Sequence, residues 1–472
     1  MATHLVWLRN DLRVYDNPAL LAACQSGDRV VALYVHETDE NTRAPGAAAR
    51  WWLHESLCSL AQSLDDIGVE LRVESGLAGS VVDKLCHEIG AEAVHWNRRY
   101  APGQRDIDAG IKSSLRGAGI SVSSHAGNVL LEPWEIETGQ GKPYSVFTPF
   151  WKALKERDIA PPLKRPQLHD KGRRRSETDN GYRKPRWAEK LSAHWTIGEA
   201  AAQDALQAFL KHHVHDYPGG RDFPARDATS RLSPHLRFGE ISARQIWHSA
   251  KAFAHAHPDK SAAVDKFLSE LTWRDFSYHQ LFHRDDIASV PMQEKYRDLK
   301  WRHAPAQLKT WQAGQTGIPI IDAGMRELWE TGYMHNRVRM LVASFLTKNL
   351  LIDWRQGENW FWDCLVDADD ANNPASWQWV AGSGLDAAPY FRIFNPVTQG
   401  QRFDPNGDYV RNWVPEVAQL PDKFIHDPSG APDEVLMQAG IQLGQEYPRA
   451  LVDLKETRRR ALDAFGALSA DG

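Results

Sequence analysis

Two indoles stand two residues apart, directly after a pair of asparagines, in the stretch NNPASWQW over residues 372–379. The chain carries 19 tryptophans among 472 residues. If Pro374 begins a helix, Asn373 is its N-cap and lies on the same face as Trp377, four residues further on. Trp379 then points to the nearly opposite side, because residues two apart are separated by about 200° around the helix axis. One helix thus offers an indole to each of two neighbours, either as core side chains or as functional groups.

A second segment, KFLSELTWRDF, carries polar groups where a core helix would be apolar. Phe267, Glu270 and Arg274 fall on one helical stripe, with Trp273 beside them. Burying a carboxylate there is costly unless it has a partner or a ligand. The alternative is a Glu and Arg pair on the surface.

A third segment, YMHNRVRM, sets Asn336 and Met340 on one helix face, with Arg337 and Arg339 on its flanks. Arginine at such positions could bind a phosphate or hold a buried acid.

Hydroxyl and carboxyl groups complete the candidates. Thr229, Ser230 and Ser233 lie where a loop is expected to enter a helix, so hydroxyls and free N–H groups could converge on a diphosphate, although ordinary helix caps look the same. Asp367 and Asp369 precede the tryptophan stretch and could equally be solvated acids at a helix start.

Composition excludes several classes of protein. The four cysteines, Cys24, Cys58, Cys86 and Cys364, form no CxxC pair, which argues against a disulfide framework or a cysteine-bound metal. Histidines in the HHVHD cluster lack the spacing for one helix face, so no metal site is predicted. The N-terminus has no signal-like apolar run and no later segment could span a bilayer, so we expect a cytoplasmic protein. The net charge of −5 does not exclude nucleic acid, because only a basic face is needed.

Hydrophobic periodicity predicts two domains. Over residues 1–130, short strand-like runs (LVWL, VVALYV, VELRV, AEAVHW, ISVSS) alternate with helical patterns, which indicates an α/β doubly wound parallel sheet. Residues 131–196 form a linker rich in Pro, Lys and Arg, including KGRRRSETDNGYRKPR. Residues 197–472 show helical spacing, as in AVDKFLSELTWRDFSYHQLF and RVRMLVASFLTKNLLIDW, so the second domain should be all-α.

Taken together, these segments resemble the DNA photolyase and cryptochrome flavoprotein family, specifically class I or class III photolyases that repair cyclobutane pyrimidine dimers. The resemblance runs from VWLRNDLRVYDNPAL through VFTPFWKA, TSRLS, ELTWRDF, TGIPIIDAGMREL, YMHNRVRM, LLIDWRQGE and NNPASWQW to DAAPYFRIFNP. It implies light-driven repair of UV-damaged DNA by a helical domain that binds FAD, active in its reduced anionic form.

The resemblance also implies which residues contact FAD. The matching positions are Tyr217, Thr229, Ser230, Arg231, Leu232, Ser233, Phe267, Glu270, Arg274, Arg339, Asp367, Asp369 and Asn373. Arg339 and Asp367 match a buried ion pair beside the flavin, and Asn373 matches the residue that faces flavin N5. An amide there indicates repair, whereas a carboxyl group would favour a protonated flavin radical, as in plant cryptochromes.

An electron relay and a substrate pocket follow from the same resemblance. Trp377 would begin a relay through Trp354 to Trp301 at the surface, for photoreduction of oxidised FAD. Glu270 would hydrogen-bond a dimer flipped out of the duplex; photolyases are an established example of base flipping. The expected contacts to the dimer and its phosphates are Arg221, Trp273, Asn336, Arg337, Met340, Trp379, Arg392 and Gln399.

Rival interpretations stay open at this point. A cryptochrome-like blue-light photoreceptor commonly has a long C-terminal extension, whereas this sequence ends soon after LVDLKETRRRALDAF. A photolyase for (6-4) photoproducts would carry a histidine pair where Asn336 and Met340 stand. A non-enzymatic nucleotide-binding protein would explain only the α/β half.

A second, light-harvesting chromophore is expected in the N-terminal domain. Gly103 and Gln104 stand where one folate-binding branch has an Asn and Glu pair, so no ligands are assigned. Methenyltetrahydrofolate is favoured over a deazaflavin or none. We further expect a monomer that associates with the nucleoid when it repairs DNA and has no contact with membranes.

Overall fold

A computed structural model describes residues 2–168, 176, 178, 181–386 and 392–470. The chain forms two compact units, each built from several segments. The first contains Met1–His215, Ser230–Asp285 and Asp367–Ala371, and the second contains Asp216–Thr229, Asp286–Val366 and Asn372–Gly472. The domain boundaries at residues 130 and 196 remain predictions. Parts of the KGRRRSETDNGYRKPR and DAAPYFRIFNP segments lie outside the described residues.

The first unit contains a five-stranded parallel sheet with strand order β3-β2-β1-β4-β5. All five predicted strands are present: β1 (Thr3–Leu8), β2 (Arg29–Glu37), β3 (Glu70–Gly76), β4 (Ala93–Asn97) and β5 (Ser121–His125). Each strand but the last is followed by a helix: α1 (Pro18–Ser26), α2 (Ala47–Asp65), α3 (Ala78–Ile89) and α4 (Pro102–Gly117).

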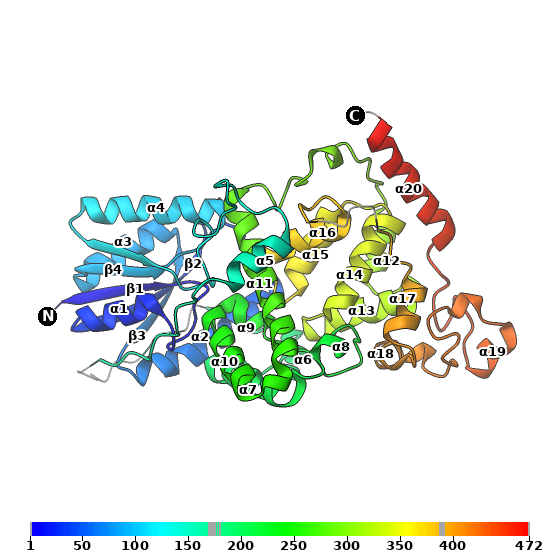
Figure 1. Ribbon diagram of the computed structural model, residues 1–472, viewed down its shortest axis with the longest axis horizontal. Coiled ribbons are helices and arrows are strands. Elements are labelled where there is room, and N and C mark those ends of the chain that lie inside the picture. Colours follow the sequence, from blue (N-terminus) through cyan, green and yellow to red (C-terminus); the bar gives the residue numbers. More distant parts are fainter. Residues whose placement is uncertain (1, 169–175, 177, 179–180, 387–391, 471–472) are drawn as a thin grey trace. The chain divides into compact units, whose positions relative to one another are not determined.

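Helices cover both faces of this sheet, with α3 and α4 on one side and α1 and α2 on the other (Figure 1). Leu5 and Trp7 alternate with Val6 along β1, so they pack with Val82 and Leu115 of α3 and α4 in one core cluster. Both faces are buried, which is why β1 is apolar along most of its length. The predicted doubly wound α/β fold is confirmed.

The first unit also contains helical segments: α5 (Phe147–Lys155), α6 (Ala188–Ser192), α7 (Glu199–Ala208), a π-turn (Phe209–His213), α9 (Ser233–Phe238), α10 (Ala243–Ala256), a 3₁₀ turn (Pro258–Lys260) and α11 (Ser261–His283).

The described part of the second unit is helical apart from the isolated bridge between Leu443 and Tyr447. Its α-helices are α8 (Tyr217–Gly220), α12 (Pro305–Gln312), α13 (Pro319–Thr331), α14 (Asn336–Ser344), α15 (Trp354–Cys364), α16 (Asn372–Ala381), α17 (Pro396–Phe403), α18 (Asp408–Trp413), α19 (Asp433–Gln438) and α20 (Leu454–Ala470). The described part of this unit also contains a short π-helix (Phe345–Asn349) and three 3₁₀ turns (Glu294–Tyr296, Pro415–Val417, Pro428–Gly430). The all-α prediction for this part of the chain is confirmed.

The helical spacing of residues 337–354 does not produce one continuous helix. After α14 the chain continues as a short π-helix (Phe345–Asn349), and Leu351 adopts a positive φ of 53° before α15 begins. Hydrophobic spacing alone cannot distinguish such a break, because the apolar positions stay buried on both sides of it.

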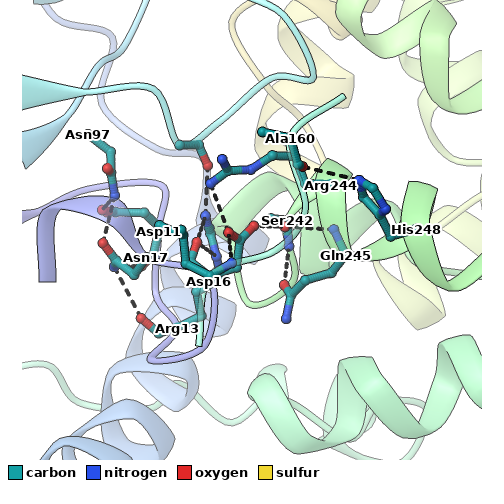
Figure 2. Close-up of polar contacts among 12 residues, drawn as sticks. Asp11, Arg13, Asp16, Asn17, Asn97, Ala160, Ser242, Arg244, Gln245 and His248 are labelled. Atoms are coloured by element: carbon teal, nitrogen blue, oxygen red, sulfur yellow. Dashed lines mark hydrogen bonds and ion pairs between the residues drawn. The ribbon is translucent and has the colours of Figure 1, made fainter. Parts of the chain in front are cut away.

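Arg13, in the loop after β1, ties the sheet to the helical part of the first unit (Figure 2). Its side chain is 1% exposed and donates to the backbone carbonyls of Asp16, Gly127 and Gly239 at 2.7–3.0 Å. Burial lowers the pKa of this guanidinium, so it needs those acceptors and the nearby carboxylates.

Asp16 completes this connection. Its carboxylate accepts from Ser242 Oγ and from Arg244 of α10 at 2.8 Å, and from the backbone N–H of Leu163 at 2.9 Å. Asp16 has a φ of +56°, a conformation that side chains other than glycine rarely adopt. The contacts hold it there, and they fix the start of α10 against the β1 loop.

Three histidines from neighbouring strands form a row on the sheet. His95 Nε2 lies 3.2 Å from His4 Nδ1, and His95 Nδ1 lies 3.5 Å from His125 Nε2. Burial, together with smaller contributions from its two histidine neighbours, lowers the pKa of His95 to about 4. The native protein therefore holds His95 neutral.

We predict a loss of stability in acid that depends on His95. The unfolded chain takes up a proton at its ordinary pKa of about 6.5, while the folded chain does so only near 4. Stability is therefore complete above pH 6.5 and falls as the pH drops toward 4. The share of His95 is about 2 kcal/mol between pH 7 and 5. Denaturant titrations at both pH values should show a smaller loss for His95→Asn, and an equal loss would contradict this prediction.

Candidate functional site

Helix α11 of the first unit carries four of the predicted site residues. Phe267 is buried and packs on Phe209 with ring centroids 4.6 Å apart. Glu270 accepts from Lys266 Nζ at 2.7 Å, one turn earlier on the same helix, and its side chain stays 23% exposed. The alternative of a surface pair between Glu270 and Arg274 is wrong, because Arg274 is buried and directed elsewhere.

Arg274 is a buried tie to the loop after β5. Its Nη1 donates to the carbonyl of Asn128 at 2.8 Å and its Nη2 to Asn128 Oδ1 at 3.0 Å. It also pairs with Asp275. These contacts fix α11 in position. They also occupy two guanidinium nitrogens of Arg274, so this side chain is poorly suited to bind a phosphate. Its predicted place beside FAD is untested.

Residues 230–233 of the TSRLS segment lie in the first unit, where Ser230 is half-buried and Ser233 meets a predicted acid. Ser233 Oγ donates to Asp367 Oδ2 at 2.6 Å. Arg231 has a positive φ of 49° and its guanidinium lies 4.3 Å from the Trp195 ring. Leu232 is the N-cap of α9 and its side chain cannot cap the first turn.

Asp369 and its neighbours are also held locally. Asp369 is 4% exposed and accepts from the backbone N–H of Ala371 at 2.9 Å. The preceding residue, Ala368, accepts from Arg237 Nε at 2.7 Å. The acids of DADDANN are therefore buried and held in place, and the alternative that they are solvated is wrong for Asp367 and Asp369.

Asn373 in the second unit has its amide oriented by a buried acid. Helix α16 begins at Asn372, so the prediction that Asn373 is an N-cap is wrong. Its Nδ2 instead donates to Glu358 Oε1 at 2.7 Å and to the Glu358 carbonyl at 3.2 Å. Both amide hydrogens are directed at Glu358, so Oδ1 is the atom that Asn373 can offer to a ligand. Sequence reasoning missed Glu358, although it lies in the LLIDWRQGE segment.

Trp377 lies directly on the backbone of α15. A Cβ added to Gly357 would stand 2.2 Å from Trp377 Cη2, so only glycine admits this ring. Trp377 also makes edge contacts with Phe361 at 5.0 Å and Trp311 at 6.4 Å. Sequence reasoning missed Gly357, whose only signal was a glycine inside a helical segment.

The other relay residues differ in exposure. Trp354 begins α15, one turn before Gly357, and is fully buried, whereas Trp301 is half-buried in a loop. No direct ring contact joins Trp354 to Trp377 or Trp301 in the described part of the chain. Trp379 is half-buried while Trp377 is 2% exposed, in agreement with the prediction that they face different sides.

Helix α14 presents the predicted polar face. Asn336 Nδ2 lies 4.0 Å from Met340 Sδ, which confirms that they share a face. Arg337 pairs with Asp222 at 2.8 Å and stacks over Phe403, and Arg339 Nε donates to the Met334 carbonyl at 2.7 Å. Because Arg339 and Asp367 belong to different units, their ion pair remains a prediction.

His335 caps the N-terminus of α14 by accepting from the backbone N–H of Arg337 at 3.2 Å. Burial lowers the pKa of His335 to about 4, so the ring stays neutral and Nδ1 remains an acceptor.

The remaining predicted contacts lie in the second unit. Tyr217 is buried beneath the guanidinium of Arg221, 5.3 Å away, and Thr229 is partly exposed. Arg392 is exposed beside Phe394, and Gln399 of α17 is half-buried. Their roles toward DNA or FAD remain predictions. Within the described residues, no group of three or more His, Cys, Asp or Glu could hold a metal, and no helix is long and apolar enough to cross a bilayer.

Comparison with known proteins identifies the family. Residues 4–167 match the family described as DNA photolyase, and residues 267–467 match the FAD binding domain of DNA photolyase. A protein of Agrobacterium fabrum named deoxyribodipyrimidine photo-lyase is 46% identical, with 98% of both chains covered. The chain therefore belongs to the DNA photolyase and cryptochrome family and contains its FAD-binding domain.

Within this family the similarity is greatest to photolyases among the relatives compared. The crystal structure of a bacterial class III photolyase from Agrobacterium tumefaciens superimposes with a TM-score of 0.95 at 46% identity, covering 100% of this chain and 98% of that one. Cryptochrome-1 of Arabidopsis thaliana is 36% identical over 98% of this chain and 70% of its own length. The class expected from the sequence is confirmed.

We predict that Gly357→Ala displaces Trp377. The added methyl group overlaps the indole and Leu346, so the free energy of unfolding should fall by roughly 1–3 kcal/mol. Gly110→Ala is the matched control, because this exposed position in α4 has no atom within 4 Å of a new Cβ. The control should be neutral or gain up to about 1 kcal/mol. Equal stability of the two variants in denaturant titrations would contradict the close contact.

Proposed function

We propose that this protein is a deoxyribodipyrimidine photo-lyase, which splits cyclobutane pyrimidine dimers in UV-damaged DNA using light and reduced FAD. The single observation that carries the proposal is the amide of Asn373, fixed by buried Glu358, in a chain 46% identical over its length to a named photo-lyase.

The residues present fit an FAD. Polar side chains that family resemblance assigns to it are pre-positioned by other groups, as Ser233 is by Asp367 and Asn373 by Glu358. When bound and reduced, FAD supplies the light-excited electron that opens the dimer. The protein's own residues bind and orient the cofactor, and the electron returns from the split dimer, so no net redox change occurs.

Asn373 supports the reduced anionic form of the cofactor. Its amide hydrogens point to Glu358, so its oxygen is available to accept from an N–H of the ligand. A neutral amide adds no second negative charge next to an anionic ring, which a carboxylate at this position would do. This favours repair over the cryptochrome alternative.

The contacts to the dimer are assigned from the family resemblance. We assign its polar edge to Glu270 and Asn336, its apolar surface to Met340, and its stacking contacts to Trp273 and Trp379. Exposed Arg392 is a further candidate for phosphate contact, which gives affinity independent of sequence. Asn336 and Met340 stand where a (6-4) enzyme would need histidines.

Trp377, Trp354 and Trp301 are proposed to carry an electron inward to oxidised FAD. Trp377 rests on Gly357, three residues after buried Trp354 in α15, which supports a transfer between the first two members. Half-buried Trp301 is the proposed exchange point with solvent.

Methenyltetrahydrofolate is the antenna that we favour over a deazaflavin. Doubly wound sheets bind flat ligands at the carboxyl ends of strands where the order reverses, here between β1 and β4. That position holds buried Arg9 and Arg99, both paired with Asp108 at 3.2 and 2.9 Å, and Arg9 stacks over Trp7. We further propose that the protein acts on the nucleoid as a monomer.

Light-dependent repair tests the proposed function. Purified protein with chemically reduced FAD should restore thymines in an oligonucleotide containing one cyclobutane dimer under blue light, and not in the dark, as followed by chromatography. Absence of repair by a protein that retains flavin would refute the proposal. A (6-4) photoproduct in the same sequence is the control and should remain intact.

Glu270→Ala should lower repair yield per photon while FAD stays bound, because the dimer loses a hydrogen-bond acceptor. Lys266→Ala is the matched variant, since it removes the partner of Glu270 and leaves the carboxylate in place. It should keep most of the yield. A yield for Glu270→Ala equal to that of the unaltered protein would remove Glu270 from the mechanism.

Trp301→Phe should slow photoreduction of oxidised FAD, because phenylalanine is far harder to oxidise than tryptophan. The same variant should repair dimers normally once chemically reduced. Absorption changes under illumination with an external reductant provide the measurement. An unaltered photoreduction rate would mean that the electron enters by another route.

A further inference from the structure

Trp273, the proposed stacking wall in the first unit, already has one ring face covered. The ring of Phe147 lies on it with centroids 3.8 Å apart and an interplanar angle of 11°. Phe276, one turn further along α11, meets both rings edge-on at 5.7 and 5.9 Å. Phe147 is buried and Trp273 is half-buried, so the exposed part of the indole lies on its edges or on the face opposite Phe147.

This face-to-face contact restricts what Trp273 can do. An indole with both faces free can rotate or accept a base on either side, whereas an indole backed by a parallel ring offers one face in one orientation. Holding a side chain in its bound orientation before the ligand arrives removes the entropy cost of ordering it on binding.

The segment that leads into Phe147 is held by a histidine of α11. Phe147 begins α5, and three residues earlier the backbone N–H of Tyr144 donates to His279 Nε2 at 3.0 Å. The other ring nitrogen, Nδ1, donates to the carbonyl of Pro133 at 3.1 Å. Both nitrogens of a neutral imidazole are therefore used to fasten the segment before α5 to the helix that carries Trp273.

Further aromatic contacts between α5 and α11 restrict the movement of the Phe147–Trp273 pair. Phe150, one turn after Phe147 on α5, packs 5.2 Å from both Phe276 and His279. It is 1% exposed, as is His279. The segment from Tyr144 to Phe150 thus meets α11 at three successive turns.

We infer that Phe147 is a positioning residue: it covers one ring face of Trp273 and orients the other face to stack on the damaged bases. His279 holds the segment that leads into Phe147. The inference rests on the proposed function, because it takes the dimer to be the ligand of Trp273. It adds a residue outside the FAD-binding helices to the determinants of preference for damaged over undamaged DNA.

Binding in the dark to a duplex with one cyclobutane dimer, compared with the same undamaged duplex, tests this inference by fluorescence anisotropy. Phe147→Ala should weaken binding to the dimer roughly three- to tenfold, the range expected when one side chain must be ordered on binding. Its affinity for undamaged duplex and its FAD content should not change. Phe147→Tyr keeps a flat ring and should restore the preference, which a role in folding alone would not require.

Trp151→Phe is the matched control, since it alters another aromatic residue of α5 that packs on Trp247 and makes no ring contact with Trp273 among the described residues. It should bind the dimer normally. If Phe147→Ala does not fold, Phe147→Leu can replace it, because leucine keeps apolar volume but has no flat ring. Phe147→Leu should show a smaller loss of affinity for the dimer. Normal dimer preference in a folded Phe147→Ala or Phe147→Leu protein overturns the inference.

His279→Leu should weaken dimer binding in the same direction, and the Phe147→Ala and His279→Leu double variant should be no weaker than Phe147→Ala alone. Additive losses would show that His279 acts independently of Phe147. If the unaltered protein shows no preference for the dimer and no repair, the proposed function fails; if it shows both while Phe147→Ala matches it, only this inference fails.

Discussion

A buried charge in the loop after β1 determines how the first unit is assembled. Arg13 is 1% exposed and its guanidinium is satisfied by carbonyls from three separate segments. A buried cation without acceptors would cost several kcal/mol, so the loop, the β5 exit and the start of α10 must come together for the chain to fold. Asp16 accepts from the start of α10 and from Leu163 in a further segment, and these contacts hold a backbone conformation that would otherwise be unfavourable.

This constraint places α9, α10 and α11 in one compact unit with the sheet. Arg274 makes a second tie from α11 to Asn128, and His279 makes a third to the segment before α5. The half-buried Trp273 therefore projects from a helix that is bonded at several positions to the segment between β5 and α5. A rigid scaffold of this kind suits a site that must hold aromatic rings in fixed orientation.

Within the second unit, too, residues that are not proposed to contact the ligand orient the side chains that are. Glu358 directs one amide, Gly357 admits one indole, and His335 caps the helix that carries Asn336 and Met340. In each case a residue with no proposed contact to the ligand determines the orientation of one that has it. Such residues are invisible to arguments that begin from reactive side chains.

Much of the fold followed from local pattern. Five apolar runs predicted five strands, and residues with 3.6 periodicity predicted α11 almost to its ends. Asn336 and Met340 were placed on one face by helix geometry alone, and the structure agrees. These features depend on neighbours within a few residues in sequence, so a linear pattern contains them.

Tertiary structure decided what each polar group is bonded to. The sequence indicated Asn373 as an N-cap and offered a surface pair of Arg274 with Glu270, but the two side chains bond to Glu358 and Asn128 instead. Glu358 is 15 residues from its partner and Asn128 is 146 residues from its own, and no periodicity links such distant positions. Buried donors pair with whatever acceptor the folded chain brings near, because an unpaired one is costly. The sequence by itself therefore determined the elements and the chemical types of the site, while packing between distant segments decided which atoms remain for a ligand.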